Sequence, residues 1–466
     1  MTSRRFEKAG AGRTLYWEVY LQDRFVCLVW GEVRGIRKTL DRNCGTPEAA
    51  RAKLAQLVAQ QLEDGYRETS AAEESDLDEI EKVLAFDGAP PPDEPPPPKP
   101  TFVFARSPEL ELQCRLSPDD RGPWEIYSDW LIGQGDVRGE LAALRRNHKD
   151  RDANRLIAMH HAALFGDLAV DDGKDIATEL SWRHGFLTGA RIKVNDPDAQ
   201  DTSFDAYVRA FMASPIAQFV ERLQLGLAVS SDNDWGPTVR ALAASEQAAF
   251  LRELRFDVET EWEISWTALG SLDGWVAFPR LEVLRFRAGD GGMLGELELP
   301  SLKVFEYESC GISKLEIEAI AAARWPKLER LELWLGAAER GAIGTIAPLR
   351  QILDGVGLPA LHHLGLCNTE LIDELIPALV ESKLLPQLRT LDLSHSTLVS
   401  SQALVTAAPA FEHLALLSLD RNLLSDHHCD EIRAALPNAK LDDQRHEEEY
   451  EGDDDEPAVR YVALWE

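Results

Sequence analysis

One pattern of apolar and variable positions recurs along residues 279–424: a leucine, two variable residues, then two apolar residues separated by one variable residue. Six clear copies lie at 281–286, 302–307, 328–333, 361–366, 388–393 and 414–419. The alternation predicts a short strand in each copy, because successive side chains of a strand point to opposite faces. Recurrence at this spacing predicts a repeat solenoid, in which neighbouring units bury one continuous core.

Weaker copies extend the repeat region in both directions, at 220–225, 251–256 and 436–441. The stretches 314–325 and 370–382, which lie between copies, have helical periodicity. Each repeat is therefore predicted to consist of a strand, a turn and a helix.

The last clear copy continues to Asn422 and completes the LxxLxLxxN pattern of a leucine-rich repeat. The repeats resemble ribonuclease-inhibitor-like bacterial repeats, above all at 328–336 and 388–398. The resemblance implies an α/β solenoid over residues 180–441, with parallel strands on its concave side and helices outside. Because solenoids of this kind hold partners on an extended surface, we expect a binding protein rather than an enzyme.

Strand alternation also predicts which side chains leave the core. The variable residue between the last two apolar positions, and the residue after them, should face the concave side. We expect there a basic patch of Arg255, Arg285 and Arg287, an acidic patch of Glu306, Glu308 and Glu332, an exposed Trp334, and Asp392. A tryptophan among charges is a common interface anchor. The same charges would also keep a solvent-facing sheet soluble, so both interpretations stay open.

The first 70 residues predict a small separate domain. The runs 15–21 and 25–33 alternate aromatic and β-branched residues with polar ones, as antiparallel strands do. Thr46 and Pro47 suit the start of a helix, and Gly65 suits its end. Apolar residues lie between them at helical spacing: Ala50, Leu54, Leu57, Val58 and Leu62. A sheet with one amphipathic helix is an α+β fold.

This order of elements resembles a WGR domain. The matching residues are Trp17-Glu18, Trp30-Gly31-Glu32, Gly35, Pro47-Glu48-Ala49-Ala50 and Gly65-Tyr66. In eukaryotic poly(ADP-ribose) polymerases this domain binds DNA ends, which implies that Trp30 could stack on a sugar or base, with Arg34, Arg37 and Lys38 on phosphates. Glu32 stands where the family has its signature arginine. Alternatively, Trp30 fills the core between sheet and helix.

Residues 71–100 are predicted to be a linker, because they carry 9 Asp+Glu against 2 Lys+Arg and end in APPPDEPPPPKP, which favours an extended spacer. Residues 101–179 resemble the short helical domain that accompanies such repeats in bacterial proteins. The matches are Tyr127, Asp129, Trp130, Leu131, Gly135, Asp136, Arg138, Gly139 and Glu140. The run SWRHGFL at 181–187 resembles the element that often introduces the repeats. Neither resemblance implies a chemistry.

The 466 residues carry a formal net charge of −31. Such a chain repels polyanions at long range, which argues against general nucleic-acid affinity. Residues 1–69, with 12 Lys+Arg against 9 Asp+Glu, are the exception. At the other end, residues 442–466 are predicted to be an acidic tail whose last ten residues alternate and form a strand that docks on the solenoid.

The six cysteines are widely spaced and lack a CxxC pair, so they fit neither a disulfide framework nor a zinc site. No apolar run approaches the ~20 residues of a membrane span. The first residues lack the apolar core of a secretory signal. We therefore expect a cytoplasmic, reduced protein without membrane contact.

Motifs for catalysis and cofactors are missing: there is no phosphate loop, no GxGxxG after a strand and no GxSxG elbow. The run His427-His428-Cys429-Asp430 could bind a metal, but adjacent ligands on one helix point in different directions. We therefore predict no catalytic residues, no metal and no cofactor. The predicted function is that of a non-enzymatic adaptor that holds a protein partner on the concave face. The alternative is a regulator that binds DNA ends through residues 1–70.

Overall fold

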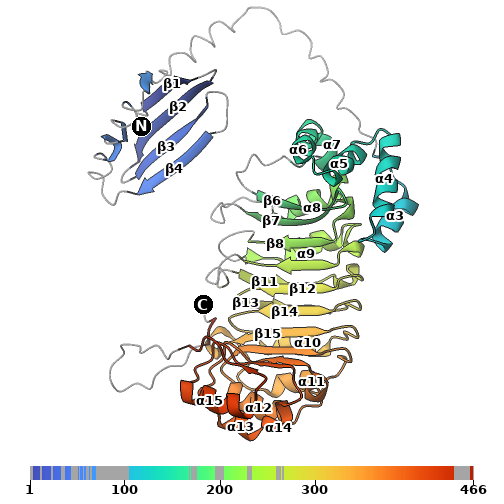
Figure 1. Ribbon diagram of the computed structural model, residues 1–466, viewed down its shortest axis with the longest axis vertical. Coiled ribbons are helices and arrows are strands. Elements are labelled where there is room, and N and C mark those ends of the chain that lie inside the picture. The colour runs from blue at the N-terminus through green and yellow to red at the C-terminus, as the bar shows by residue number, and fades with distance from the viewer. Residues whose placement is uncertain are drawn as a thin grey trace, which may run out of the picture. The chain divides into compact units, whose positions relative to one another are not determined.

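The computed structural model describes parts of residues 4–69, most of residues 104–445, and residues 462–464. Within 104–445 the description omits residues 167, 169–175, 195–203, 228–232, 259–263 and 265–266. The chain divides into two units, Met1–Pro100 and Thr101–Glu466 (Figure 1).

The first unit contains a five-stranded antiparallel sheet in the order β4-β3-β2-β1-β5. Its strands are β1 (Arg4–Gly10), β2 (Arg13–Gln22), β3 (Phe25–Glu32), β4 (Arg37–Asn43) and β5 (Arg67–Thr69). The described residues between 51 and 62 are helical. Val58 from this stretch is buried in one cluster with Phe6, Trp17 and Val19 of the sheet. Sheet and helix thus share a small core, whereas the likeness to a WGR domain stays a prediction.

The second unit is built on an 11-stranded sheet in the order β19-β18-β17-β16-β15-β14-β12-β10-β8-β7-β6. Its strands are β6 (Ile176–Arg183), β7 (Phe186–Val194), β8 (Arg222–Leu225), β10 (Glu253–Phe256), β12 (Val283–Arg287), β14 (Val304–Glu308), β15 (Arg330–Gly336), β16 (His363–Thr369), β17 (Thr390–Asp392), β18 (Leu416–Ser418) and β19 (Ala439–Lys440). Among the described strands of this sheet, only β6 and β7 pair antiparallel. Every predicted copy of the repeat, weak or clear, contributes one parallel strand, and the strands follow sequence order.

The apolar positions of the repeat explain this register. Leu254, Leu284, Phe305 and Leu331 are directly paired neighbours on successive strands, and each has no exposed side chain. The second apolar position forms a parallel row two residues later, from Phe256 onward. A register slip of one residue would turn both rows to solvent, so apolar burial fixes the pairing of all the repeat strands. The mixed α/β solenoid predicted from the sequence is confirmed.

Helices and 3-10 turns cover the face of the sheet toward which these apolar rows point (Figure 1). Those of the repeats are α8 (Phe204–Ala213), α9 (Gly236–Ala243), α10 (Lys314–Ala322), α11 (Arg350–Leu353), α12 (Ile372–Val380), α13 (Gln402–Thr406), α14 (Ala408–Phe411) and α15 (Asp426–Ala435). A capping box of Ser313 and Glu316 starts α10. Between β12 and β14 the fully described chain forms no α-helix, because the two repeats start only 21 residues apart. The prediction of a helix in every repeat was therefore wrong at this point.

A short second sheet of three parallel strands runs alongside, in the order β13-β11-β9. These strands are β9 (Asn233–Asp234), β11 (Thr267–Ser271) and β13 (Asp290–Met293). Each of them follows a strand of the main sheet, at β8, β10 and β12. The leucine pattern does not predict them.

Asn422 shows why the repeat pattern ends in asparagine. Its side chain has no exposed surface, and its Nδ2 donates to the carbonyl oxygens of Leu393 at 3.1 Å and Leu419 at 3.0 Å. Its Oδ1 accepts from the backbone N–H of Leu398 at 3.3 Å. The amide thus satisfies backbone groups that the turn leaves buried and unpaired by the sheet.

In the described residues of the second unit, five helices precede the sheet: α3 (Pro108–Leu116), α4 (Arg121–Gly133), α5 (Val137–Arg146), α6 (Asp150–Met159) and α7 (His161–Phe165). Asp136 caps α5 by accepting the backbone N–H of Arg138 at 3.0 Å. A Cβ on Gly139 would lie 2.7 Å from the backbone of Ser128 and Ile132, so only glycine allows α4 and α5 to approach this closely. The motif noted at 127–140 is thus a helix-packing motif. The solenoid sheet begins at Ile176, a few residues before the predicted boundary at 180.

Residues 462–464 return to the solenoid and dock beside β16 and β17. The side chains of Val462 and Leu464 are buried. Leu464 is bound through the side chain of Asn368 rather than through a strand, and none of the three residues belongs to a sheet. In the part of the predicted terminal strand that the structure describes, the chain docks on the solenoid as expected but does not form a β-ladder.

Candidate interaction surface

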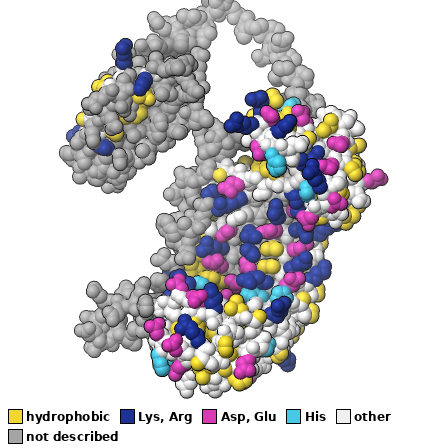
Figure 2. Space-filling view, viewed as in Figure 1, with side chains coloured by type: hydrophobic (Ala, Val, Ile, Leu, Met, Phe, Trp, Pro, Cys, Tyr) yellow, Lys and Arg dark blue, Asp and Glu magenta, His cyan; other side chains and the backbone are white. Residues whose placement is uncertain are grey.

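The variable residues of the repeat strands lie on the sheet face opposite the apolar core. One row pairs in register along six strands, and the next lies two residues further on. We call these two rows the exposed sheet face: Arg255, Arg285, Glu306, Glu332, Gly365 and Asp392, then Asp257, Arg287, Glu308, Trp334 and Cys367. Figure 2 shows basic and acidic side chains interleaved over the strands. Strand alternation in the sequence therefore predicted that these side chains face away from the core, and they do.

Seven of the eight predicted partner-binding residues line one hollow of about 140 Å³ in this face. They are Arg255, Arg285, Arg287, Glu306, Glu308, Glu332 and Trp334. The eighth, Asp392, lies two strands beyond β15 and accepts the backbone N–H of Ser394 at 3.0 Å. Its carboxylate therefore supports a turn and is not part of the hollow.

The predicted basic and acidic patches are joined into ion pairs across neighbouring strands. Arg285 Nε lies 2.7 Å from Glu306 Oε2, and Arg287 Nε lies 3.0 Å from Glu308 Oε1. Glu306 also contacts Arg330 at 2.7 Å, and Arg330 contacts Glu332. The face therefore presents a network of both signs rather than two separate patches. Adjacent strands lie about 5 Å apart, which brings long opposite charges into reach.

Trp334 is half-buried, not exposed as predicted. Its ring lies 4.5 Å from the ring of His395, and its Nε1 donates to Glu332 Oε1 at 3.0 Å. Trp334 stands on β15 and His395 follows β17, so their contact bridges the strand between them. Small side chains on that strand, Gly365 and Cys367, leave the room for the bridge. The partly covered ring still offers an edge to a partner.

Glu332 occupies the space above Gly365, where an added Cβ would lie 2.7 Å from Glu332 Cγ. Burial opposes the ionisation of Glu332, but hydrogen bonds from His363 and Trp334 and the charge of Arg330 outweigh it and lower the pKa to about 2. His363 Nε2 lies 3.5 Å from Glu332 Oε2, and its Nδ1 lies 2.6 Å from Thr390 Oγ1. Glu332 is therefore a fixed negative charge at the floor of the face.

A second hollow, of about 360 Å³, continues the face toward β6 and β7. Arg191, Arg222 and Glu253 line it together with Arg255. Arg191 was not predicted because the hairpin strands β6 and β7 lack the leucine pattern, and Arg222 on β8 was not predicted because it precedes the two variable positions taken to face the concave side. Alternation in residues 186–194 was the available signal, since Arg191 pairs in register with Gln224 of the first repeat strand.

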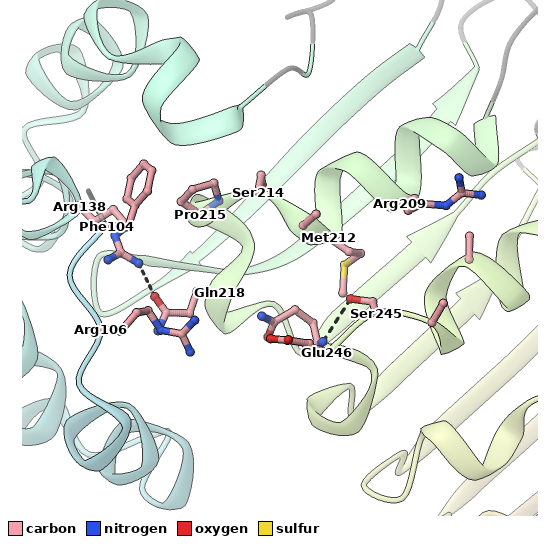
Figure 3. Close-up of a pocket in the computed structure, with 14 residues that line it drawn as sticks. Phe104, Arg106, Arg138, Arg209, Met212, Ser214, Pro215, Gln218, Ser245 and Glu246 are labelled. Carbon is pink, nitrogen blue, oxygen red and sulfur yellow. Dashed lines mark hydrogen bonds between the residues drawn. The ribbon is translucent and has the colours of Figure 1, made fainter. Parts of the chain in front are cut away.

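A larger cavity, of about 480 Å³, lies where the helices before the sheet meet the first repeat (Figure 3). Arg138 is buried there; it contacts Gln218, binds Asp136 at 2.7 Å and donates to the carbonyl oxygen of Ala105 at 2.6 Å. Burial raises the pKa of the neighbouring Tyr127 to about 12. Arg138 and Gln218 come from α5 and η1 (Pro215–Phe219), so this polar network fastens the helices to the solenoid.

The residues proposed for nucleic-acid contact lie in the first unit. Trp30 on β3 pairs with Lys38 on β4, and Gly31 pairs with Arg37. Arg34 falls outside the described residues. The backbone thus brings three of the four positions onto adjacent strands.

Three side chains on the helical side resemble a catalytic set: Ser401, His428 and Glu431. Ser401 Oγ lies 2.9 Å from His428 Nδ1, and that nitrogen also lies 3.3 Å from Glu431 Oε2. A relay needs the hydroxyl and the carboxylate on opposite ring nitrogens, so this set cannot act as one. Among the described residues, no cluster of three or more His, Cys, Asp or Glu side chains could hold a metal ion. His427 and Cys429 therefore have no ligand set around them there.

No helix in the described part of the chain has both the length and the apolar character that crossing a membrane requires.

The fold and this surface define the class: an α/β leucine-rich repeat solenoid with a charged, hollowed sheet face. No protein-family model matches the chain. Leucine-rich repeat-containing protein 43 of Mus musculus is 31% identical to it over 212 residues, which are 45% of this chain and 28% of that protein. A crystal structure of a Bacteroides fragilis protein covers 99% of both chains at 18% identity with a TM-score of 0.47, a likeness too low to carry an argument.

Proposed function

We propose that this protein is a non-enzymatic adaptor that holds a protein partner on its exposed sheet face. The observation that carries the proposal is the hollow around Glu332 and Trp334, which seven predicted residues line. The partial likeness to a leucine-rich repeat-containing protein supports an interaction role for the repeats. Four buried free thiols, Cys114, Cys310, Cys367 and Cys429, support a reducing compartment such as the cytoplasm.

The ion-pair network defines the chemistry of the partner. Each arginine of the hollow already has a carboxylate neighbour, so a partner of one charge sign would gain little from the face as a whole. A segment with alternating charges can instead exchange pairs with Arg285, Arg287 and Glu308, and rest an apolar group on Trp334. Complementary charges of this kind set register and specificity more than affinity.

The test uses the full-length protein as bait in an extract of cells that express it. A partner should be retained by the wild type and lost at least about tenfold with Trp334→Ala, since tryptophan anchors carry much of an interface's free energy. Leu315→Ser is the matched control, because Leu315 is 71% exposed on α10, on the helical side. Equal loss with both variants, or with neither, would contradict the proposal.

The second candidate function, binding of DNA ends by residues 1–70, is supported by the adjacency of Trp30 and Lys38 on β3 and β4. Titration of the full chain with blunt, nicked and single-stranded DNA over a range of salt tests it. Binding that weakens steeply with salt and is lost in Trp30→Ala would support a DNA-end sensor. No binding at low salt would leave the protein-binding role alone.

A further inference from the structure

The segment 462–464 occupies a small built site at the ends of β16 and β17. Leu464 donates its backbone N–H to Asn368 Oδ1 at 2.8 Å, and its carbonyl oxygen accepts from Asn368 Nδ2 at 2.8 Å. Ala463 donates its N–H to the carbonyl oxygen of His395 at 3.2 Å. Val462 and Leu464 are 2% and 4% exposed, and Leu464 belongs to the buried apolar cluster of the repeats.

The receptor side of this site is fixed by the repeats. Asn368 has no exposed surface, and its backbone N–H donates to the carbonyl oxygen of Ser394 at 3.0 Å. Its φ of 53° is left-handed, a conformation that asparagine tolerates better than most residues. One amide therefore hydrogen-bonds both the N–H and the carbonyl oxygen of a single residue, which is recognition of a peptide through its backbone. Without the segment, a buried donor and a buried acceptor would lose their partners.

The attachment itself is slight by comparison with a repeat. The docked residues form no ladder, and their described hydrogen bonds run to the Asn368 side chain and the His395 carbonyl. Each repeat strand from β8 to β18, in contrast, is bonded to a neighbouring strand on both sides, and the edge strand β19 to β18. Elements with so few bonds open at a much lower free energy than the core they rest on.

We propose that this place is a peptide-binding site, which the chain's own segment 462–464 fills in cis. Its ligand class is a short peptide that bends at a small residue and carries one buried apolar side chain on either side of it. A partner segment of the same chemistry binds there when the cis segment leaves. The site is separate from the hollow around Glu332, and its function does not depend on the proposed function of the exposed sheet face.

Cleavage in the folded full chain gives a direct test. A protease site replaces residues 450–456, and the protein is cut after folding and washed. The probe is a fluorescent synthetic peptide of residues 457–466. The cut, washed protein should bind it at least tenfold more tightly than the uncut protein, in which the tethered segment competes at high effective concentration.

Matched variants define the contacts. Peptide Leu464→Asp should bind at least tenfold more weakly, and peptide Ala463→Ser should bind like the wild type, because Ala463 uses only its backbone. In the protein, Asn368→Asp keeps the left-handed backbone but removes the Nδ2 donor, so it should weaken binding about tenfold. Equal binding to cut and uncut protein, or indifference to both Leu464→Asp and Asn368→Asp, would overturn the proposal.

Hydrogen exchange of the uncut protein covers the case in which the cut chain does not stay folded. The amides of Ala463 and Leu464 should exchange faster in Asn368→Asp, while the amides of β15 and β16 stay protected. Loss of protection throughout the sheet would make the segment an integral part of the core and would overturn the proposal. Dimers formed by exchange of the segment between two copies would support it, since that exchange is binding in trans.

Discussion

The two halves of the exposed sheet face use the same backbone for different purposes. Over β10 to β15 the variable positions carry Arg285, Glu306 and Glu332, which are paired across strands and line an open hollow. Over β16 to β18 the same row carries Gly365, Asp392 and Ser418. Here the side chains are small or support turns. The repeat pattern fixes where side chains point, and the residue at each variable position decides whether the surface forms an open charged hollow or is filled by neighbouring side chains.

Both halves should depend equally on their leucine rows. Leu331→Ala on β15 and Leu391→Ala on β17 should each lower the free energy of unfolding by about 2–5 kcal/mol, because each leaves a cavity at a fully buried position. Denaturant titration measures the loss. Leu315→Ala, at a position that is 71% exposed, should change stability by less than about 0.5 kcal/mol. A marked difference between β15 and β17 would show that the two halves are not held by one core.

Glu332, in the half over β10 to β15, should make the stability of the fold depend on pH. Its pKa in the folded state, about 2, lies below the ordinary value of 4.5, so its ionised form stabilises the fold above pH 4.5. That contribution, on the order of 3 kcal/mol, is lost as the pH falls from 4.5 toward 2. Wild type and Glu332→Gln should therefore differ in stability at pH 7 and converge near pH 2. Glu329→Gln, whose side chain is 53% exposed, serves as the control, and a constant difference for Glu332→Gln would contradict the assignment.

The leucine pattern carries most of the information about the fold and only part of that about the site. Leu331 and its counterparts could be placed from the sequence because their burial repeats with each copy. The burial of Trp334 could not, because it depends on His395, which belongs to a different repeat and lies outside the strand pattern. The bond between Asn368 and Leu464 joins residues 96 positions apart, and no local pattern encodes such a contact.

Substitution of Gly365 tests whether the lack of a side chain at this position gives Glu332 its space at the boundary between the two halves. Gly365→Ala places a Cβ 2.7 Å from Glu332 Cγ, so Glu332 must move away from His363. We expect a loss of about 1–3 kcal/mol, measured by thermal or chemical unfolding. Gly344→Ala is the matched control, because an added Cβ there meets nothing within 4 Å. Equal effects of the two substitutions would mean that Glu332 is not confined by the glycine.

The smallest expected effect concerns the ion pairs of the open half. A double-mutant cycle on Arg287 and Glu308, whose side chains are 20% and 29% exposed, should give a coupling energy of up to about 1 kcal/mol. The pair Lys314 and Glu318 on α10, with exposures of 69% and 53%, should give about 0.3 kcal/mol or less. Equal couplings would indicate that the network does not pre-order the face.

The most direct test of partner binding on the open half is site-specific photo-crosslinking in living cells. A photoreactive amino acid replaces Val304, which is half-buried on the exposed sheet face beside Arg330. In a second variant of the same chain, the photoreactive amino acid replaces Leu315 on the helical side. We predict a discrete cross-linked protein from position 304 that is absent from position 315 and is lost when Trp334→Ala is added. Cross-links of equal yield from both positions, or from position 315 alone, would contradict the role of this face.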